Sequence, residues 1–440
     1  MNIVFIAPDF PEKSNTYLML PSLDLTIMSA ALKGKGHNCS LIDMRINEYN
    51  FSDLKRILLT EERKEHIDLI CIDGLVDTHC NVNKVIKTCK YVLRETPVAL
   101  RGEVATFLPK EVLLRNFNLD YVMSGECEET ILELVDYLSG KGGRLTEIKS
   151  LSFREKGTNE IVVNSKRTSL KNLDELPYPD RNLYDIKKYL KRDSETIVRS
   201  SRGCPGNCAF CIYTKLTPFR LFSVQRFCDE IEELQRYGFE SFFFSDYTFA
   251  FSDKRVEDFY QETQKRNLHV KFTSNIRIKD INEFKIKRMK EIGAYRVFVG
   301  IETINSNSSE LINKNITKEE IIDKIKILKK YDIEYHGSFI IGNPGDTEDD
   351  LKATEELLGE LNPTVVTFNH LKMMPGTDIY NRPNDFDILP FDPFWFEKDD
   401  WSYYPSAGTN QLPPDKILYW SERLAKAFIK NEVNQIFSAH

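Results

Sequence analysis

The chain has 440 residues, of which 41% are hydrophobic, and 60 basic against 67 acidic side chains give a formal charge of −7. This length allows a large core divided over two or three domains, and the scattered lysines and arginines form no basic stripe that would favour nucleic acid. No run approaches the roughly 18 apolar residues of a membrane helix, and Pro8 follows too early for a signal peptide, so we expect a cytoplasmic protein with no membrane partner.

Residues 1–140 alternate apolar runs with amphipathic runs. The predicted strands are Ile3–Ala7, Cys39–Ile42, Ile67–Ile72, Pro97–Leu100 and Leu119–Met123. The predicted helices are Leu25–Lys35, Leu54–Arg63, Val82–Leu93 and Glu128–Ser139. Continuous apolar strands separated by helices indicate an α/β domain with a doubly wound parallel sheet. A ligand of such a sheet lies at the carboxyl ends of the strands, here near Pro8, Asp73, Arg101 and Ser124.

Residues 141–194 differ in composition from what precedes them. A hairpin is predicted where two apolar runs flank the turn-rich Glu155–Glu160. Leu176–Arg181 contains two prolines and suits neither a helix nor a central strand. We therefore expect 141–194 to be a linker with a hairpin.

A second α/β alternation occupies residues 195–378. Its predicted strands are Thr196–Ser200, Ser241–Ser245, Val270–Ser274, Tyr295–Ile301, Tyr335–Ile341 and Thr364–Asn369. A helical pattern follows each of the first five strands, and six strands indicate a partial (β/α)6 barrel rather than a complete eightfold one. Residues 379–440 form a C-terminal extension that is rich in proline and aromatic residues and ends in a helix near Asp415–Asn431.

Three of the nine cysteines form a cluster, whereas the other six are spread over predicted strands and helices. Cys204, Cys208 and Cys211 lie on a loop rich in glycine and proline, directly after the first barrel strand. Their thiolates can hold an iron–sulfur cluster, and since such a cluster normally takes four thiolates, one iron would be left for an exogenous ligand. Zinc is the alternative, but it needs a fourth Cys or His, and the nearest candidate, Cys228, lies in the following helix.

This loop resembles the cysteine motif of the radical S-adenosylmethionine (SAM) superfamily, with Phe210 as its aromatic residue. Three further segments resemble motifs of the same family in the same order, namely Val299–Thr303, Gly337–Thr347 and Pro375–Thr377. The resemblance implies a [4Fe-4S] cluster on the three cysteines and reductive cleavage of SAM to a 5′-deoxyadenosyl radical. It also implies a set of SAM-binding residues: Phe210, Ser245, Asp246, Arg277, Gly300, Glu302 and Ile341.

In that set the Phe210 backbone and Ile341 would hold the adenine, and Glu302 the ribose hydroxyls. Ser245 and Asp246 would take the SAM ammonium, and Arg277 would pair with the SAM carboxylate. For Asp246 and Arg277 a solvated surface role is an open alternative.

The first domain resembles the cobalamin-binding, Rossmann-like domain that often precedes a radical SAM barrel. Three segments carry this resemblance, namely Pro21–Leu25, Tyr121–Glu128 and the linker Leu176–Arg181. The cobalamin contacts that it implies are Pro21, Ser22, Leu23, Asp73, Arg101, Gly102, Glu103, Ser124, Gly125 and Glu126.

Several positions depart from the cobalamin-binding pattern. The motif that supplies a histidine to cobalt is absent, because neither His37 nor His66 lies in it. Arg101 replaces the first residue of a Gly-Gly turn, Asp73 replaces the usual Ser or Thr, and Cys127 takes a glycine position. Arg101 could clash with the nucleotide tail of cobalamin or bind its phosphate, and a domain that has lost its ligand is an alternative.

The sequence thus predicts a radical SAM enzyme that methylates an unactivated carbon of a small-molecule or peptide substrate with cobalamin. It would need an external electron donor such as flavodoxin or ferredoxin. The alternatives are a cobalamin-independent radical SAM epimerase, cyclase or dehydrogenase, and a non-catalytic protein with an electron-transfer cluster. His336, Tyr213 and the aromatic tail are candidate linings of a substrate pocket, with core packing as the alternative role.

Overall fold

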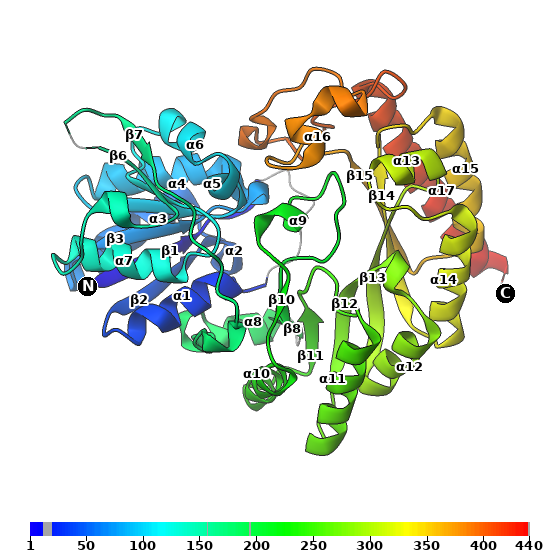
Figure 1. Ribbon diagram of the computed structural model, residues 1–440, viewed down its shortest axis with the longest axis horizontal. Helices are drawn as coiled ribbons and strands as arrows, with labels where there is room; N and C mark the ends of the chain where they lie inside the picture. Colours follow the sequence, from blue (N-terminus) through cyan, green and yellow to red (C-terminus); the bar gives the residue numbers. More distant parts are fainter. Residues whose placement is uncertain (12–19, 156, 193–194, 439–440) are drawn as a thin grey trace. The chain divides into compact units, whose positions relative to one another are not determined.

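The computed structural model describes residues 1–11, 20–155, 157–192 and 195–438, with side chains to residue 429 (Figure 1). The chain divides into two compact units. The first comprises Met1–Asp193 and Phe394–Tyr403, and the second comprises Ser194–Pro393 and Tyr404–His440. The expected start of the barrel at residue 195 follows residues 193–194, and the expected hairpin turn contains residue 156; these three positions lie outside the described residues.

The first unit is built on a seven-stranded sheet with the order β2-β1-β3-β4-β5-β6-β7. The parallel strands are β1 (Asn2–Ala7), β2 (Asn38–Asp43), β3 (Leu69–Asp73), β4 (Val98–Arg101) and β5 (Tyr121–Met123). Every residue of β3, β4 and β5 is buried, which explains why these strands are apolar except for Asp73 and Arg101 at the carboxyl ends of β3 and β4. The order of strands reverses between β1 and β3, and ligands of such sheets bind at this reversal.

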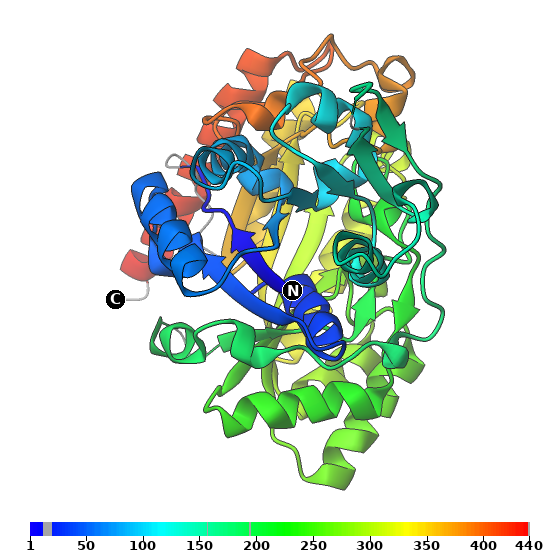
Figure 2. The same ribbon diagram turned by 90° about the vertical axis from the view of Figure 1, so that its left-hand side faces the viewer.

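Helices cover both faces of this sheet, as the sequence predicts for a doubly wound fold. Helices α1 (Leu23–Lys33) and α7 (Glu128–Leu138) pack together on one face, and α3 (Phe51–Lys64) and α4 (His79–Val92) on the other (Figure 2). The core under α1 and α7 contains alternate residues of the strands, such as Ile3 and Phe5 of β1. This alternation follows from the twofold period of a strand.

The predicted hairpin is an integral part of this sheet. Strands β6 (Leu151–Arg154) and β7 (Ile161–Val163) pair in antiparallel fashion, and β6 also pairs with β5. The proline-rich segment after the hairpin binds to α1, where Asp180 accepts a hydrogen bond from Ser29 at 2.6 Å and pairs with Lys33 at 2.7 Å. Residues 141–192 therefore pack on the first unit along much of their length.

The second unit is built on six parallel strands with the order β15-β14-β13-β12-β11-β8. These are β8 (Glu195–Val198), β11 (Ser241–Phe244), β12 (Lys271–Arg277), β13 (Ala294–Glu302), β14 (Glu334–Ile341) and β15 (Val365–His370). The helices between successive strands are α10 (Val224–Arg236), α11 (Asp253–Arg266), α12 (Glu283–Ile292), α14 (Lys318–Lys330) and α15 (Glu348–Leu361). The expected partial barrel is confirmed, and the terminal helix α17 (Pro414–Ser438) packs beside β15 and α15 (Figure 1).

A short segment near the C-terminal end of the chain belongs to the first unit, which the sequence did not predict. We call Phe394–Tyr403 the strap. Its Phe396 is fully buried and packs edge-on against His79 at 5.0 Å between ring centroids. Two ion pairs also hold the strap, Arg115–Glu397 and Lys84–Asp399, the latter at 2.7 Å. Among the described residues, no helix is long and apolar enough to cross a membrane.

Candidate active site

The cysteine loop leaves the barrel through a short strand, β9 (Ser201–Arg202), which pairs with β10 (Arg220–Leu221). Gly203 begins the loop with a φ of 75°, and a side chain there would lie 2.5 Å from the carbonyl oxygen of Thr217. Only glycine suits this combination of left-handed backbone and close approach. The turn directs the chain away from the sheet and into the segment that carries the three cysteines.

Cys204, Cys208 and Cys211 are partly exposed, whereas five of the other six cysteines are buried. The three thiols act on one another electrostatically, so they lie in one neighbourhood. Burial, followed by the neighbouring Cys208, raises the pKa of the Cys211 thiol to about 12. A bound metal would replace this proton, because thiolates are the ligands that metals bind. The loop backbone also supports the sulfurs, since Gly206 N–H donates to Cys204 Sγ at 3.3 Å.

The donor set fits an iron–sulfur cluster better than a single ion. In the described part of the chain, no group of three or more His, Cys, Asp or Glu side chains converges on one metal position. A cluster binds each thiolate to a different iron, so its three sulfurs need not converge. Zinc would need a fourth ligand, and Cys228 is buried in α10 beside charged groups such as Arg266 and Glu262.

Asp246, expected to bind the SAM ammonium, is hydrogen-bonded to the residues that lead into the cysteine loop. Its carboxylate accepts hydrogen bonds from the Ser200 amide at 3.2 Å, the Ser200 hydroxyl at 3.0 Å and the Ser201 hydroxyl. The side chain is buried, and its neighbour Ser245 donates to the carbonyl of Val198 at 3.2 Å. Both residues therefore connect the ends of β8 and β11. Their expected contact with the SAM ammonium stays a prediction.

Arg277, at the end of β12, lies beside the cysteine loop. Its Nε and Nη2 donate to the two carboxylate oxygens of Asp280 at 2.6 and 2.7 Å, which is a bidentate pair. Its Nη1 lies 3.3 Å from the position that a side chain at Gly206 would occupy. Arg277 is thus a paired cation whose remaining nitrogen faces the loop, which agrees with the expected role next to the SAM carboxylate.

Glu302 forms an ion pair that the sequence did not predict. Its Oε1 lies 3.3 Å from Lys314 Nζ, and both side chains are about nine-tenths buried. Glu302 has a φ of 70°, and the pairing of β13 with β14 shifts register between Gly300 and Glu302. A side chain at Gly300 would lie 2.3 Å from Glu302 Oε1. The Gly-Ile-Glu sequence therefore lets the carboxylate fold back over its own strand towards Lys314.

Ile341, expected to hold the adenine, is buried in the barrel sheet. It is 1% exposed and lies on the buried face of β14 with Tyr335 and Phe339. Alternation along the strand places His336, Ser338 and Ile340 on the opposite, partly exposed face. The expected adenine contact of Ile341 therefore stays a prediction, and Ile340 is its neighbour on the partly exposed face.

The partly exposed face of the barrel sheet carries further polar and aromatic side chains. His336 Nε2 lies 3.2 Å from the hydroxyl of Thr367, and the His336 ring lies 5.1 Å from that of Phe298. Burial and Arg296 lower the pKa of His336, so the ring is neutral near pH 7. Tyr213 stacks on Tyr247 at 4.2 Å beyond the cysteine loop. His336 is thus a polar lining residue of this face and not only a core residue.

At the carboxyl ends of β3 and β4 in the first unit, Arg101 is held by two carboxylates. Its Nη1 pairs with Asp73, and its Nη2 pairs with Asp24 of α1 at 2.8 Å. The residue is 8% exposed, and in this structure its guanidinium is engaged in ion pairs within the first unit. Whether Arg101 clashes with a nucleotide tail or binds its phosphate stays a prediction.

The other expected cobalamin contacts have mixed environments. Gly102 is closed off, because a side chain there would meet the Gly74 carbonyl at 2.0 Å, whereas a side chain at Gly125 would find no heavy atom within 4 Å. Ser124 Oγ donates to the Ala105 carbonyl at 3.0 Å, and Glu103 accepts from the Val76 amide at 3.2 Å. Burial raises the pKa of Glu103 to about 7.

Ser22 caps α1, and Pro21 and Leu23 beside it are buried, while Glu126 follows Gly125 and is partly exposed. The open space at Gly125 and the inward-turned Arg101 fit a ligand at this edge of the sheet.

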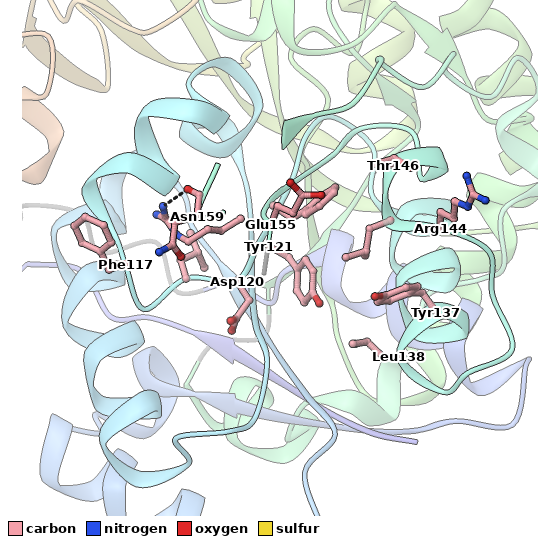
Figure 3. A pocket seen from close by; sticks show the side chains of 13 residues that line it. Phe117, Asp120, Tyr121, Tyr137, Leu138, Arg144, Thr146, Glu155 and Asn159 are labelled. Carbon is pink, nitrogen blue, oxygen red and sulfur yellow. Dashed lines mark hydrogen bonds between the residues drawn. The ribbon is translucent and has the colours of Figure 1, made fainter. Parts of the chain in front are cut away.

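A separate cavity of about 500 Å³ lies in the first unit (Figure 3). Figure 3 shows Tyr121, Tyr137 and Glu155 around it, with Arg144 at one end and Phe117 at the other. Tyr121 is the first residue of β5, so the cavity is at the amino end of that strand. It therefore lies away from the sheet edge where cobalamin would bind.

Comparison with known proteins gives a consistent result for both units. The family model described as the radical SAM superfamily matches residues 198–358. An uncharacterised methyltransferase of Pyrococcus horikoshii is 32% identical over 365 residues, covering 82% of this chain and 78% of the relative. An anaerobic magnesium-protoporphyrin IX monomethyl ester cyclase of Cereibacter sphaeroides is 24% identical, covering 88% of this chain and 64% of the relative.

Among solved structures, the chain is similar to the radical SAM methyltransferase TsrM of Kitasatospora setae, solved with cobalamin and a [4Fe-4S] cluster bound. The TM-score is 0.71 at 15% identity, and the alignment covers 86% of this chain and 76% of that one. At this identity the similarity shows the shared two-domain fold.

Proposed function

The chain belongs to the radical SAM superfamily, and from this membership we propose that it is a cobalamin-dependent methyltransferase acting on a small molecule or peptide. The observation that carries the radical chemistry is the grouping of Cys204, Cys208 and Cys211 in one electrostatic neighbourhood next to the Glu302–Lys314 pair. The cofactors of the superfamily are a [4Fe-4S] cluster and SAM.

The residues of the second unit divide the task of binding between them. Cys204, Cys208 and Cys211 would hold the cluster, which would supply the electron for reductive cleavage of SAM. Glu302 would accept hydrogen bonds from the ribose hydroxyls. Lys314 holds one oxygen of its carboxylate, which orients the other oxygen for this contact. Arg277 directs Nη1 towards the SAM carboxylate while Asp280 holds its other two nitrogens. An external one-electron donor, such as a flavodoxin or ferredoxin, reduces the cluster.

Cobalamin at the first unit is the second part of the proposal. The strand order of this unit, the inward-turned Arg101 and the open space at Gly125 support it. Cobalamin, when bound, carries the methyl group. In the overall reaction one SAM would give up its methyl group and leave as S-adenosylhomocysteine. A second SAM would be cleaved to methionine and a 5′-deoxyadenosyl radical, which would take a hydrogen atom from the substrate carbon and leave as 5′-deoxyadenosine.

A cobalt measurement tests this second part. The protein is purified from cells supplied with hydroxocobalamin, and its cobalt content and visible spectrum are recorded next to its iron content. We expect close to one cobalt per chain, and 5′-deoxyadenosine from SAM after reduction. A cobalt-free protein that still forms 5′-deoxyadenosine, and that transfers no methyl group from labelled SAM, would contradict cobalamin-dependent methylation. A cobalamin-independent cyclase or epimerase would then be the better proposal.

A further inference from the structure

We propose that Lys314 is a positioning residue of the SAM site, which orients Glu302 for the ribose and places a fixed positive charge beside the iron–sulfur cluster. This inference rests on the proposed function and adds a residue that lies outside all the sequence motifs. Two observations carry it, namely the turn that attaches Lys314 to the cysteine loop and the two polar contacts of its ammonium.

The turn that contains Lys314 is anchored to the cysteine loop. It follows α13 (Ser306–Leu311), and Asn313 and Asn315 on either side of the lysine have φ values of 60° and 47°. Asparagine tolerates this left-handed conformation better than most residues do. The carbonyl of Ile312 accepts a hydrogen bond at 3.1 Å from the amide of Ala209, which lies between Cys208 and Cys211. The lysine is therefore fixed relative to the thiols by the backbone.

The Lys314 ammonium has two partners on β13. Its Nζ lies 3.0 Å from the Gly300 carbonyl and 3.3 Å from Glu302 Oε1. Burial by itself lowers the pKa of Lys314, but the neighbouring Glu302 and Cys208 outweigh this effect, so the pKa lies above its usual value. The side chain is 7% exposed and stays charged, as a buried ion does when it is paired and hydrogen-bonded.

This pairing fixes the direction of the Glu302 carboxylate. Within the described residues, Lys314 is the one side chain paired with that carboxylate, through Oε1. The second oxygen is left to accept hydrogen bonds from a ligand. A carboxylate that is already oriented loses less conformational entropy on binding, so Lys314 should strengthen SAM binding without touching the ribose itself.

Lys314 also acts on the cluster through its charge. The residue after Cys208, Ala209, donates its amide to the Ile312 carbonyl at 3.1 Å, so the turn that carries Lys314 is hydrogen-bonded to the cysteine loop. A cluster becomes more negative when it is reduced, and a nearby positive charge stabilises the reduced form. Net charge around a cluster is one of the factors that set its potential. Removing the lysine should therefore shift the midpoint potential to more negative values.

The experiment compares Lys314→Met with Lys314→Arg in the full-length, anaerobically reconstituted protein. SAM affinity is measured by equilibrium dialysis, and the midpoint potential by redox titration followed by electron paramagnetic resonance. We expect Lys314→Met to bind SAM at least about tenfold more weakly, since hydrogen bonds to charged groups are worth about 1.5–3 kcal/mol, and to have a more negative potential. Lys314→Arg should retain most of both properties.

Glu302→Gln and Lys324→Met serve as the comparison variants. Glu302→Gln removes a negative charge, so it should shift the potential in the opposite direction while also weakening SAM binding. Lys324 lies on α14, and its ammonium donates a hydrogen bond to the carbonyl of Ile281 at 2.8 Å. Lys324→Met should leave both the SAM affinity and the midpoint potential unchanged. If Lys314→Met does not fold, the double variant Lys314→Met/Glu302→Gln removes both buried charges, and weak SAM binding at a near-normal potential is expected.

Wild-type SAM affinity and potential in Lys314→Met with its cluster intact would overturn the role of Lys314. Failure of the proposed radical chemistry is distinguishable from this outcome, because the unsubstituted protein would then form no [4Fe-4S] cluster or would release no 5′-deoxyadenosine from SAM. Failure of the cobalamin part would show as missing cobalt in the unsubstituted protein, with SAM binding and cleavage retained.

Discussion

Asp73 and Arg101 are register partners at the carboxyl ends of β3 and β4, and their side chains form a buried ion pair. The Arg101 guanidinium also pairs with Asp24 of α1 at 2.8 Å, so one cation joins two strands and a helix. Asp73 is 2% exposed, and its carboxylate would lose its charge partner if Arg101 were replaced. The ion pair therefore belongs to the stability of the first unit, whatever ligand binds at that edge.

Replacing Arg101 with methionine should destabilise the first unit by about 3–5 kcal/mol, because removing one partner leaves a buried charge uncompensated. Urea unfolding of cobalamin-free protein measures this without any contribution from a ligand. Arg56→Met is the matched control, since Arg56 pairs with Asp53 at the surface and such pairs contribute little. Equal unfolding midpoints for the two variants would contradict the structural role of Arg101.

The three cysteines of the loop should differ from the buried cysteines in the effect of an alanine substitution. Cys204→Ala, Cys208→Ala and Cys211→Ala each remove a cluster ligand, and we expect loss of the [4Fe-4S] spectrum and of 5′-deoxyadenosine formation. Cys71→Ala and Cys89→Ala alter fully buried side chains, so they should cost about 1 kcal/mol of stability and leave the spectrum unchanged. SAM cleavage at the wild-type rate in Cys208→Ala would refute the cluster assignment.

Gly300→Ala should weaken SAM binding while costing little stability. The new methyl group would displace the end of the Glu302 side chain, which can move, but would thereby pull the carboxylate away from Lys314. Gly337 on the neighbouring strand is the control, because a methyl group there meets only ordinary contacts of 3.5 Å or more. Dialysis against SAM and thermal unfolding of both variants check this expectation, and equal SAM affinities would show that the Glu302 position is not critical.

Asp346 should make the stability of the second unit depend on pH. Burial raises the pKa of its carboxyl from 3.8 to about 7, with a hydrogen bond from Thr303 at 2.8 Å acting in the opposite direction. Between these two pKa values the folded protein binds a proton that the unfolded chain has released, so the free energy of unfolding falls as the pH rises. Asp346→Asn should reduce the fall of the unfolding free energy with pH between pH 3.8 and about 7, as measured by urea unfolding. An unchanged pH dependence in this variant would mean that other groups cause it.

The strap should stabilise α4 although it is distant in sequence. Phe396→Ala removes a fully buried ring next to His79, and such truncations cost about 3–5 kcal/mol. Hydrogen exchange should accelerate in α4, while Tyr403→Ala, which alters a side chain that is 41% exposed, should have little effect. Unchanged exchange in α4 of Phe396→Ala would mean that the strap contributes nothing to this unit.

The sequence by itself determined the family and the order of the elements. Buried parallel strands are continuously apolar, and the helices between them are amphipathic, so both sheets follow from local patterning. The spacing of Cys204, Cys208 and Cys211 after a strand predicts their shared loop in the same way, because all three residues lie within eight positions of one another. The strands, the helices and the shared cysteine loop depend on residues that are close in the chain, so the local sequence is enough to predict them.

Only the tertiary structure decided where the charged side chains point. Arg101 pairs with Asp24 across 77 residues, and Lys314 reaches the neighbourhood of Cys208 from a turn that contains none of the motifs. The strap likewise binds α4 from the other end of the chain. The direction of a side chain depends on the partners that folding brings next to it. A buried charge turns towards whichever opposite charge lies within reach, because leaving it unpaired costs about 3–5 kcal/mol of stability.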